Sequence, residues 1–114
     1  MTLRDITAGL GFTVRCSEEK LDQTVTGVYC GDLLSDVMAH STQGNVWVTI
    51  QVHVNVVAVA VLKDLAAIIL VNDREPSGDT LEKAVKEQMP ILATPMSAYE
   101  VSGKLYSLGL GNVT

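Results

Sequence analysis

The feature that most constrains the fold is the alternation, from residue 24 onward, of short apolar runs rich in β-branched residues with segments of helical pattern. Strands are predicted over residues 24–29, 46–50, 66–71 and 89–93, and helices over residues 33–39, 79–88 and 98–108. This alternation indicates parallel neighbouring strands, because parallel strands need a crossover connection. The sequence therefore predicts one α/β domain over residues 1–114, with three layers in which helices flank a mostly parallel sheet.

The first 23 residues add a further helix and strand. Thr2 can cap a helix over residues 3–10, with Asp5 in its first turn and Gly11 at its end. Residues 12–16 are predicted to form a short strand, and the charged residues 17–23 a surface turn. At the other end of the chain, residues 112–114 are predicted to be a short tail.

The segment 52–65 has two interpretations. Val52, Val54 and Val56 alternate with polar residues, as in a strand, but the apolar run that follows has no clean period. Periodicity cannot separate a buried strand from a buried helix in so short a run. A helix here would supply the crossover between two parallel strands.

Composition and charge restrict the class of protein. Hydrophobic residues make up 47% of the chain and aromatic residues only 4%, which suits a core of aliphatic side chains around buried parallel strands. The net charge is -5, and the eight Lys and Arg residues are scattered, so nucleic acid is not an expected partner. The most apolar stretch, residues 46–62, is too short and too polar to span a membrane. No apolar run opens the chain, so we expect a cytoplasmic location.

The sequence lacks the usual signatures of an enzyme or a metal site. It has no Walker A string and no Gly-x-Gly-x-x-Gly after a strand, and no nucleophile elbow. Cys16 and Cys30, with two histidines, match no zinc spacing, so neither a metal nor a cofactor is expected. His40 and His53 are the only bases that titrate near neutral pH, and neither is paired with a nucleophile in the sequence. Enzyme activity is therefore the least favoured interpretation.

Several polar or glycine positions follow the predicted strands. In open α/β sheets, ligands bind outside the carboxyl ends of the strands, where the loops after neighbouring strands meet. The candidate ligand-binding residues are Gly31, Asp32, His53, Asn55, Asn72, Thr94 and Ser97.

Most of these candidates also have a purely structural interpretation. Asp32 can cap the helix over residues 33–39, which would place a carboxylate where an anion would otherwise bind. Ser97 can cap the helix over residues 98–108. His53 and Asn55 can bond the free backbone groups of a helix start, an interpretation favoured for Asn55 and evenly balanced for His53.

Three segments, in order, support a family resemblance. They are Val28-Tyr29-Cys30-Gly31-Asp32-Leu33-Leu34-Ser35-Asp36-Val37-Met38-Ala39, Ala67-Ile68-Ile69-Leu70-Val71-Asn72 and Pro90-Ile91-Leu92-Ala93-Thr94-Pro95. With them the chain resembles the DRTGG domain, which is related to the N-terminal domain of HPr kinase/phosphorylase and also occurs in some pyrophosphatases and phosphotransacetylases. The resemblance spans roughly residues 10 to 108.

The resemblance implies a compact α/β domain, a helix within residues 53–65, and a regulatory or oligomerising role beside catalytic domains. The string Asp-Arg-Thr-Gly-Gly does not occur here. Asn72-Asp73 stands where a glycine-rich strand end is expected, which weakens the case for an anion site built on glycine.

These observations lead to two functional hypotheses. The first is a stand-alone regulatory module without catalytic activity that acts by contact with a regulated protein, as yet unidentified, and by pairing with itself. A mean hydropathy of +0.28 is high for so small a domain and favours a homodimer. The second is a sensor of a small ligand, a nucleotide or another phosphorylated metabolite, at the carboxyl edge of the sheet.

Overall fold

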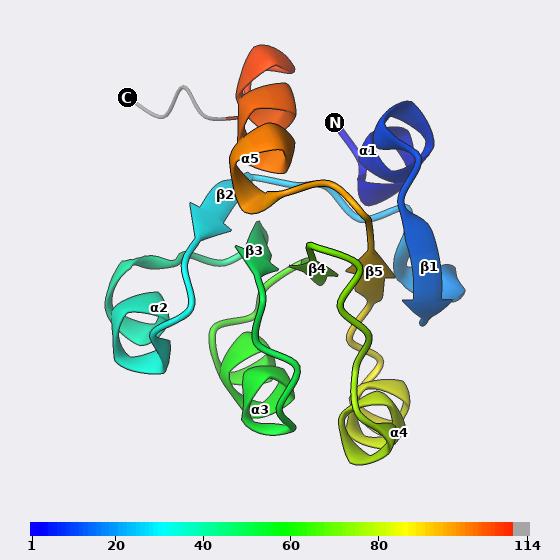
Figure 1. Ribbon diagram of the computed structural model, residues 1–114, viewed down its shortest axis with the longest axis vertical. Coiled ribbons are helices and arrows are strands. Elements are labelled where there is room, and N and C mark those ends of the chain that lie inside the picture. Colours follow the sequence, from blue (N-terminus) through cyan, green and yellow to red (C-terminus); the bar gives the residue numbers. More distant parts are fainter. Residues whose placement is uncertain (111–114) are drawn as a thin grey trace.

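The structure is a computed structural model that describes residues 1–110 (Figure 1). The predicted tail, residues 112–114, lies outside the described residues. The helices are α1 (Leu3–Leu10), α2 (Leu34–His40), α3 (Asn55–Leu62), α4 (Gly78–Glu87) and α5 (Ala98–Ser107), with a short 3-10 turn, η1 (Glu18–Lys20). The strands are β1 (Thr13–Cys16), β2 (Gly27–Cys30), β3 (Asn45–Thr49), β4 (Ala67–Leu70) and β5 (Ile91–Ala93).

The strands form one sheet in the order β1-β5-β4-β3-β2. Strands β2 to β5 run parallel, and β1 pairs antiparallel with β5 at one edge. Helices α1 and α5 cover one face, and α2, α3 and α4 cover the other (Figure 1). The predicted three-layer α/β fold with a mostly parallel sheet is therefore confirmed.

The side chains of the central strands alternate between two cores. Along β3, Val46 and Val48 pack with α1 and α5, whereas Trp47 packs with α2, α3 and α4. All three are fully buried. Because both faces of the sheet are covered, β3 and β4 are buried at every position rather than at alternate ones.

Helix α3 answers the question left open for residues 52–65. Val56, Val57 and Ala60 are buried against the sheet, and the alternating residues before them do not form a strand. β3 and β4 are parallel neighbours, so the chain between them must cross from one end of the sheet to the other. The helix that the family resemblance implies is the one that forms.

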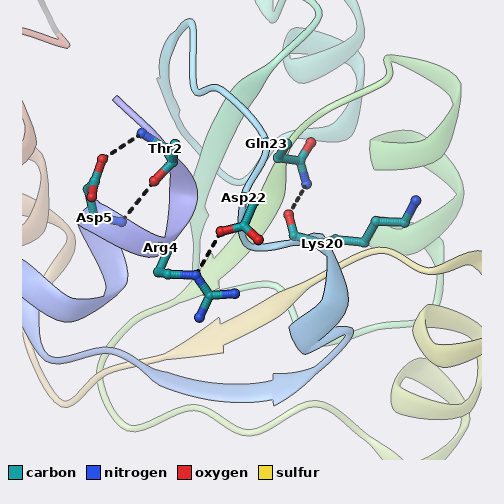
Figure 2. A network of polar contacts seen from close by, with 6 residues as sticks. All are labelled: Thr2, Arg4, Asp5, Lys20, Asp22 and Gln23. Carbon is teal, nitrogen blue, oxygen red and sulfur yellow. Dashed lines mark hydrogen bonds and ion pairs between the residues drawn. The ribbon is translucent and has the colours of Figure 1, made fainter.

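Polar contacts fix the start of α1 against the loop that precedes β2. Thr2 Oγ1 accepts a hydrogen bond from the Asp5 N–H at 3.2 Å, and Asp5 Oδ2 accepts one from the Thr2 N–H at 3.0 Å. This reciprocal pair is a capping box. These bonds lower the pKa of Asp5. Arg4 pairs with Asp22 at 2.8 Å, and Gln23 donates to the Lys20 carbonyl (Figure 2). The predicted Thr2 cap is confirmed.

Some predicted boundaries are wrong by a few residues. β2 begins at Gly27 rather than residue 24, because Thr24 forms an isolated antiparallel bridge with Thr2. α2 begins at Leu34 rather than residue 33, and β5 covers only residues 91–93. At β5, Met89 and Pro90 are buried but lie outside the paired register, so the apolar pattern extends beyond the paired residues.

Candidate functional site

All seven predicted site residues lie past the carboxyl ends of the parallel strands. Gly31 and Asp32 follow β2, and His53 and Asn55 lie at the start of α3, after β3. Asn72 follows β4, and Thr94 and Ser97 follow β5. Because β2, β3, β4 and β5 are parallel neighbours, these loops occupy one edge of the sheet.

Asp32 does not cap α2, so that prediction is wrong. Leu33 occupies the N-cap position and makes no side-chain cap bond. Asp32 Oδ1 instead accepts from Thr49 Oγ1 at 2.7 Å and from the Ile50 N–H at 3.0 Å, and the Asp32 carbonyl accepts from Gln51 Nε2. Thr49 is buried, and a buried hydroxyl needs a partner. Asp32 therefore ties the loop after β2 to the end of β3.

Gly31 has a packing role at this junction. Its carbonyl accepts from the indole Nε1 of Trp47 at 2.8 Å, and its N–H donates to the Val48 carbonyl at 3.1 Å. A Cβ at Gly31 would come within 3.0 Å of the Tyr29 hydroxyl oxygen. A side chain at position 31 would therefore displace the Tyr29 ring.

A polar cluster beside this junction was not identified from the sequence. The Tyr29 hydroxyl donates to Asp36, and the other carboxylate oxygen of Asp36 lies 3.0 Å from His40 Nδ1. Burial, followed by the bond to Asp36, raises the pKa of Tyr29 to about 12. The Tyr29 bond, with a smaller effect of the His40 charge, lowers the pKa of Asp36. The i,i+4 spacing of Asp36 and His40 was the one sequence signal for this cluster.

His53, and not Asn55, bonds the backbone at the start of α3. His53 Nδ1 accepts from the Asn55 N–H at 3.2 Å, and both side chains are exposed. Among the described residues, the Asn55 side chain forms no hydrogen bond, so the capping role favoured for Asn55 is wrong. The difference arises because Asn55 is already inside the first turn, past the position from which a side chain can cap.

The start of α3 is joined to the start of α4. The Val52 carbonyl accepts from Thr80 Oγ1 at 2.7 Å and from Ser77 Oγ at 3.4 Å. Ser77 also donates to Asp79, and this bond is the largest cause that lowers the Asp79 pKa. A charge on His53 is the smallest of the causes that lower the same pKa.

Asn72 and Asp73 form a tight turn after β4. Both have φ of +58°, and the Arg74 N–H donates to the Val71 carbonyl, as in a type I′ turn. The Asn72 N–H donates to the Met96 carbonyl at 2.9 Å and the Asp73 N–H to the Thr94 carbonyl at 3.0 Å. The turn keeps a glycine-like backbone, but its N–H groups bind the next loop rather than an anion.

Thr94 and Ser97 are also engaged in local bonds. Thr94 is 3% exposed, and its hydroxyl accepts from the Met96 N–H at 3.2 Å. Ser97 Oγ accepts from the Glu100 N–H at 3.2 Å, so the predicted cap of α5 is confirmed. The space left between these loops is about 40 Å³, lined in part by Arg15, Asp73 and Thr94. A single water molecule occupies about 30 Å³, so this space is too small for a nucleotide or another phosphorylated ligand.

A larger hollow lies beside Val54, the residue between His53 and Asn55. It has a volume of about 250 Å³ and is lined by Val54, Asp79, Glu82, Lys83 and Lys86. Glu82 and Lys86 have the i,i+4 spacing of an ion pair, but the pair that forms on α4 joins Lys83 to Glu87, at 3.9 Å. The ammonium groups of Lys83 and Lys86 and the carboxylates of Asp79 and Glu82, all from α4, therefore line this hollow.

Residues 1–110 hold neither a metal-ligand cluster nor a membrane-spanning helix, and their two cysteines are free. Within that range, no group of three or more His, Cys, Asp or Glu side chains is arranged to hold a metal ion. Cys16 donates weakly to the Met89 carbonyl, and Cys30 is exposed. None of the helices in this range is both long and apolar enough to cross a bilayer.

Comparison with known proteins adds a family and a solved structure. The family model of the DRTGG domain matches residues 5–108. No curated protein matches the chain. The fold is similar to a crystal structure of the CBS and DRTGG domains of the regulatory region of Clostridium perfringens pyrophosphatase, complexed with the activator diadenosine tetraphosphate. The TM-score is 0.71 at 16% identity, and the match covers 96% of this chain and 47% of that one, so this chain spans about half the length of that structure.

Proposed function

Because the chain belongs to the DRTGG domain family, we propose that it is a regulatory module that senses a small nucleotide or phosphorylated ligand and has no catalytic activity of its own. The observation that carries the proposal is the solved relative, in which a DRTGG domain is part of the regulatory region of an enzyme and that region is complexed with a nucleotide activator. The relation to the N-terminal domain of HPr kinase/phosphorylase and a cytoplasmic location stay predictions.

The position on this chain that best fits such a ligand is the hollow at the start of α3. The exposed His53 and Asn55 flank Val54, which lines it, and Lys83 and Lys86 can supply positive charge to a phosphate group. Asp32, which is exposed at the same edge of the sheet, has one carboxylate oxygen engaged and can accept from ribose or base donors with the other. The other candidates, Asn72, Thr94 and Ser97, support the loops around this edge.

A lack of catalysis is consistent with what the two histidines do. His40 is paired with Asp36, and His53 accepts from a backbone N–H at the start of α3. A general base must reach a substrate proton, and a nucleophile needs a base beside it. The hydroxyl closest to this pattern, that of Tyr29, has its pKa raised to about 12, which disfavours it as a nucleophile.

Thermal unfolding in the presence of nucleotides and phosphorylated metabolites tests the proposal. A ligand present at 100 times its Kd stabilises the folded state by about 2.7 kcal/mol, which raises the Tm of a domain of this size by several degrees. We expect Lys86→Ala and His53→Ala to reduce this shift. The matched control is Lys20→Ala, because Lys20 is exposed in η1, outside the hollow.

The outcome decides between sensing and protein contact alone. A shift for one class of phosphorylated ligand that disappears in Lys86→Ala but survives in Lys20→Ala supports sensing at α3 and α4. If no ligand in the panel shifts the Tm, or if Lys20→Ala removes the shift equally, sensing at this hollow is wrong. The remaining hypothesis would then be regulation by contact with another protein, for which the exposed Tyr99 and Tyr106 of α5 are the specific observation.

A further inference from the structure

The two edges of the sheet differ in how well they are protected against a further strand. Among the described residues, β1 forms one edge and β2 the other (Figure 1). In β1 the register shifts between Val14 and Cys16, so Arg15 lies in a bulge, and its side chain pairs with Glu75. A bulge and a charged side chain both hinder the addition of a strand. β2 pairs with β3 in unbroken register and contains neither a charged residue nor a proline, so its edge lacks these features.

The backbone of β2 offers hydrogen-bonding groups at this edge. The Gly31 N–H donates to the Val48 carbonyl, so the backbone of Gly31 faces β3. The backbone groups of successive strand residues point to opposite sides, so Tyr29 also faces β3, whereas Val28 and Cys30 face outward. No described residue outside the sheet bonds the N–H of Val28 or Cys30. Two N–H and two C=O groups are therefore free to pair with an extended segment.

A hollow of about 480 Å³ lies beside the same strand. It is bordered by Gly27 and Val28 of β2, by His40 at the end of α2, and by Thr42 in the loop before β3. A segment that pairs with Val28 directs every second side chain toward one face of the sheet. Side chains on the α2 face of such a segment would come next to this hollow.

His40 sets the polarity of the hollow, because none of the residues that line it is Lys, Arg, Asp or Glu. His40 Nδ1 lies 3.0 Å from one oxygen of Asp36, and the other oxygen accepts from the Tyr29 hydroxyl. The Tyr29 bond is the largest cause that lowers the pKa of Asp36, which is therefore ionised at neutral pH. A carboxylate at Nδ1 favours the tautomer with its hydrogen there and leaves Nε2 of the neutral ring as an acceptor. An acceptor backed by a negative charge suits an ammonium or guanidinium group.

We propose that the outer edge of β2 binds an extended segment of a partner protein, which adds to the sheet as a further strand and places a Lys or Arg side chain in the hollow beside His40. Backbone hydrogen bonds to Val28 and Cys30 supply affinity, and the hollow selects the side chain. A basic segment also fits the net charge of -5 of this chain. The edge shares no lining residue with the hollow at α3 and α4, so this pairing does not rest on the proposed sensing.

Binding of short peptides to the whole chain tests the proposal. The probes are the fluorescein-labelled peptide Thr-Val-Lys-Val-Thr, with blocked termini, and versions with Arg or Glu at the centre. Fluorescence polarisation is expected to give the Lys and Arg peptides a Kd of roughly tens to hundreds of micromolar, and the Glu peptide a Kd about tenfold higher or more. Hydrogen exchange measured by NMR should slow at the amides of Val28 and Cys30 when peptide is added, and change little at Tyr29.

A pair of substitutions at Val28 separates backbone pairing from side-chain contact. Val28→Pro removes the outward N–H, and proline is tolerated in an edge strand where that group faces solvent. It should weaken binding of the Lys peptide about tenfold. Val28→Thr keeps the N–H and a similar shape, so its Kd should stay within about twofold of the wild type. The Tm of each variant shows whether it is folded.

His40→Lys tests the hollow without touching the strand, so the proposal stays testable if Val28→Pro does not fold. The added charge should weaken binding of the Lys peptide and strengthen that of the Glu peptide. Ser35→Lys, at another exposed position of α2, is the matched control and should change neither.

Three results would overturn the proposal. The first is no binding of either basic peptide at about 1 mM, where even a weak site is occupied. The second is equal binding of the Glu peptide, or an equal effect of Ser35→Lys and His40→Lys. The third is slowed exchange at Val28 and Cys30 in the protein alone as its concentration rises, because a second copy, as in the predicted homodimer, would then occupy the edge.

Discussion

At the scale of single residues, the turn after β4 needs two residues with positive φ, and neither of them is a glycine. Asn72 and Asp73 both have φ of +58°, in the left-handed region. That region costs an L-residue about 1–2 kcal/mol, less for Asn and Asp, whereas glycine enters it without strain. The family resemblance led us to expect glycine here, and the backbone shows why, although the N–H groups of the turn bind Met96 and Thr94.

Replacing either residue of this turn with glycine is expected to stabilise the protein. The relief of left-handed strain in Asn72→Gly exceeds the entropy that glycine loses on folding, which leaves a net gain of about 0.5–1 kcal/mol. The urea midpoint measures it. Ser35→Gly, on the exposed side of α2, is the control and should lose about 0.5–1 kcal/mol. A similar loss in both variants would contradict the strain.

Tyr29 is expected to be the residue with a delayed titration. Its folded-state pKa is raised to about 12 from an ordinary value of 10.0, because burial and the bond to Asp36 favour the neutral phenol. A raised pKa contributes stability that is complete below pH 10 and is lost as the pH rises toward 12. Ultraviolet difference absorbance should detect a phenolate that forms in this range, and Tyr29→Phe should remove it. An unchanged titration in Tyr29→Phe would assign the late step to another tyrosine.

At the scale of helices and strands, the order and type of most elements could be predicted from the sequence. The hydrogen bonds that connect one element to another could not. The strands predicted from β-branched runs all form, because a strand buried on both faces has a strong compositional signal. α3 could not be identified from periodicity, since every residue from Val56 to Leu62 is apolar. Its helical state is set by the parallel pairing of β3 with β4, which is a property of the sheet and not of the segment.

The same distinction applies to the candidate site. Topology alone places the loops after parallel strands at one edge, so the seven residues could be predicted to gather there. The sequence could not show that the Asp32 carboxylate would reach Thr49 and Ile50 rather than the start of α2. Nor could it show that His53 would bond the Asn55 N–H. Both depend on side-chain directions and on distances between segments, which a linear pattern does not contain.

The contact between the starts of α3 and α4 is expected to depend on the hydrogen bond of one buried hydroxyl. Thr80 is fully buried, and its Oγ1 donates to the Val52 carbonyl. Thr80→Val removes the donor and should cost about 1–3 kcal/mol, measured by the urea midpoint, because the carbonyl loses its partner.

Thr7→Val provides the matched control for this joint. The Thr7 hydroxyl is buried without a hydrogen-bond partner among the described residues, so its replacement should be neutral or stabilising. Equal losses in the two variants would show that burial of a methyl-sized group, and not the bond to Val52, sets the cost.

At the scale of the whole molecule, the sheet separates two surfaces of different character. The side with α2, α3 and α4 presents the hollow with Lys83 and Lys86, and the side with α1 and α5 presents the exposed tyrosines. β3 and β4 lie at the centre and are buried on both faces, so they form a rigid layer between the two. Substitutions on the two surfaces can therefore be made one at a time, and any effect of one surface on binding at the other can be measured as a free energy.

Trp47 gives this molecule a built-in optical reporter. It is the only tryptophan of the chain, it is fully shielded from water, and its indole nitrogen is held by the Gly31 carbonyl where the β2 loop meets β3. Its emission arises on the α3 side of the sheet and next to Asp32, whereas the tyrosines of α5 lie on the opposite side. Fluorescence excited through tryptophan therefore follows events at the ligand-side edge without an attached dye, and it is insensitive by position to what the α5 surface contacts.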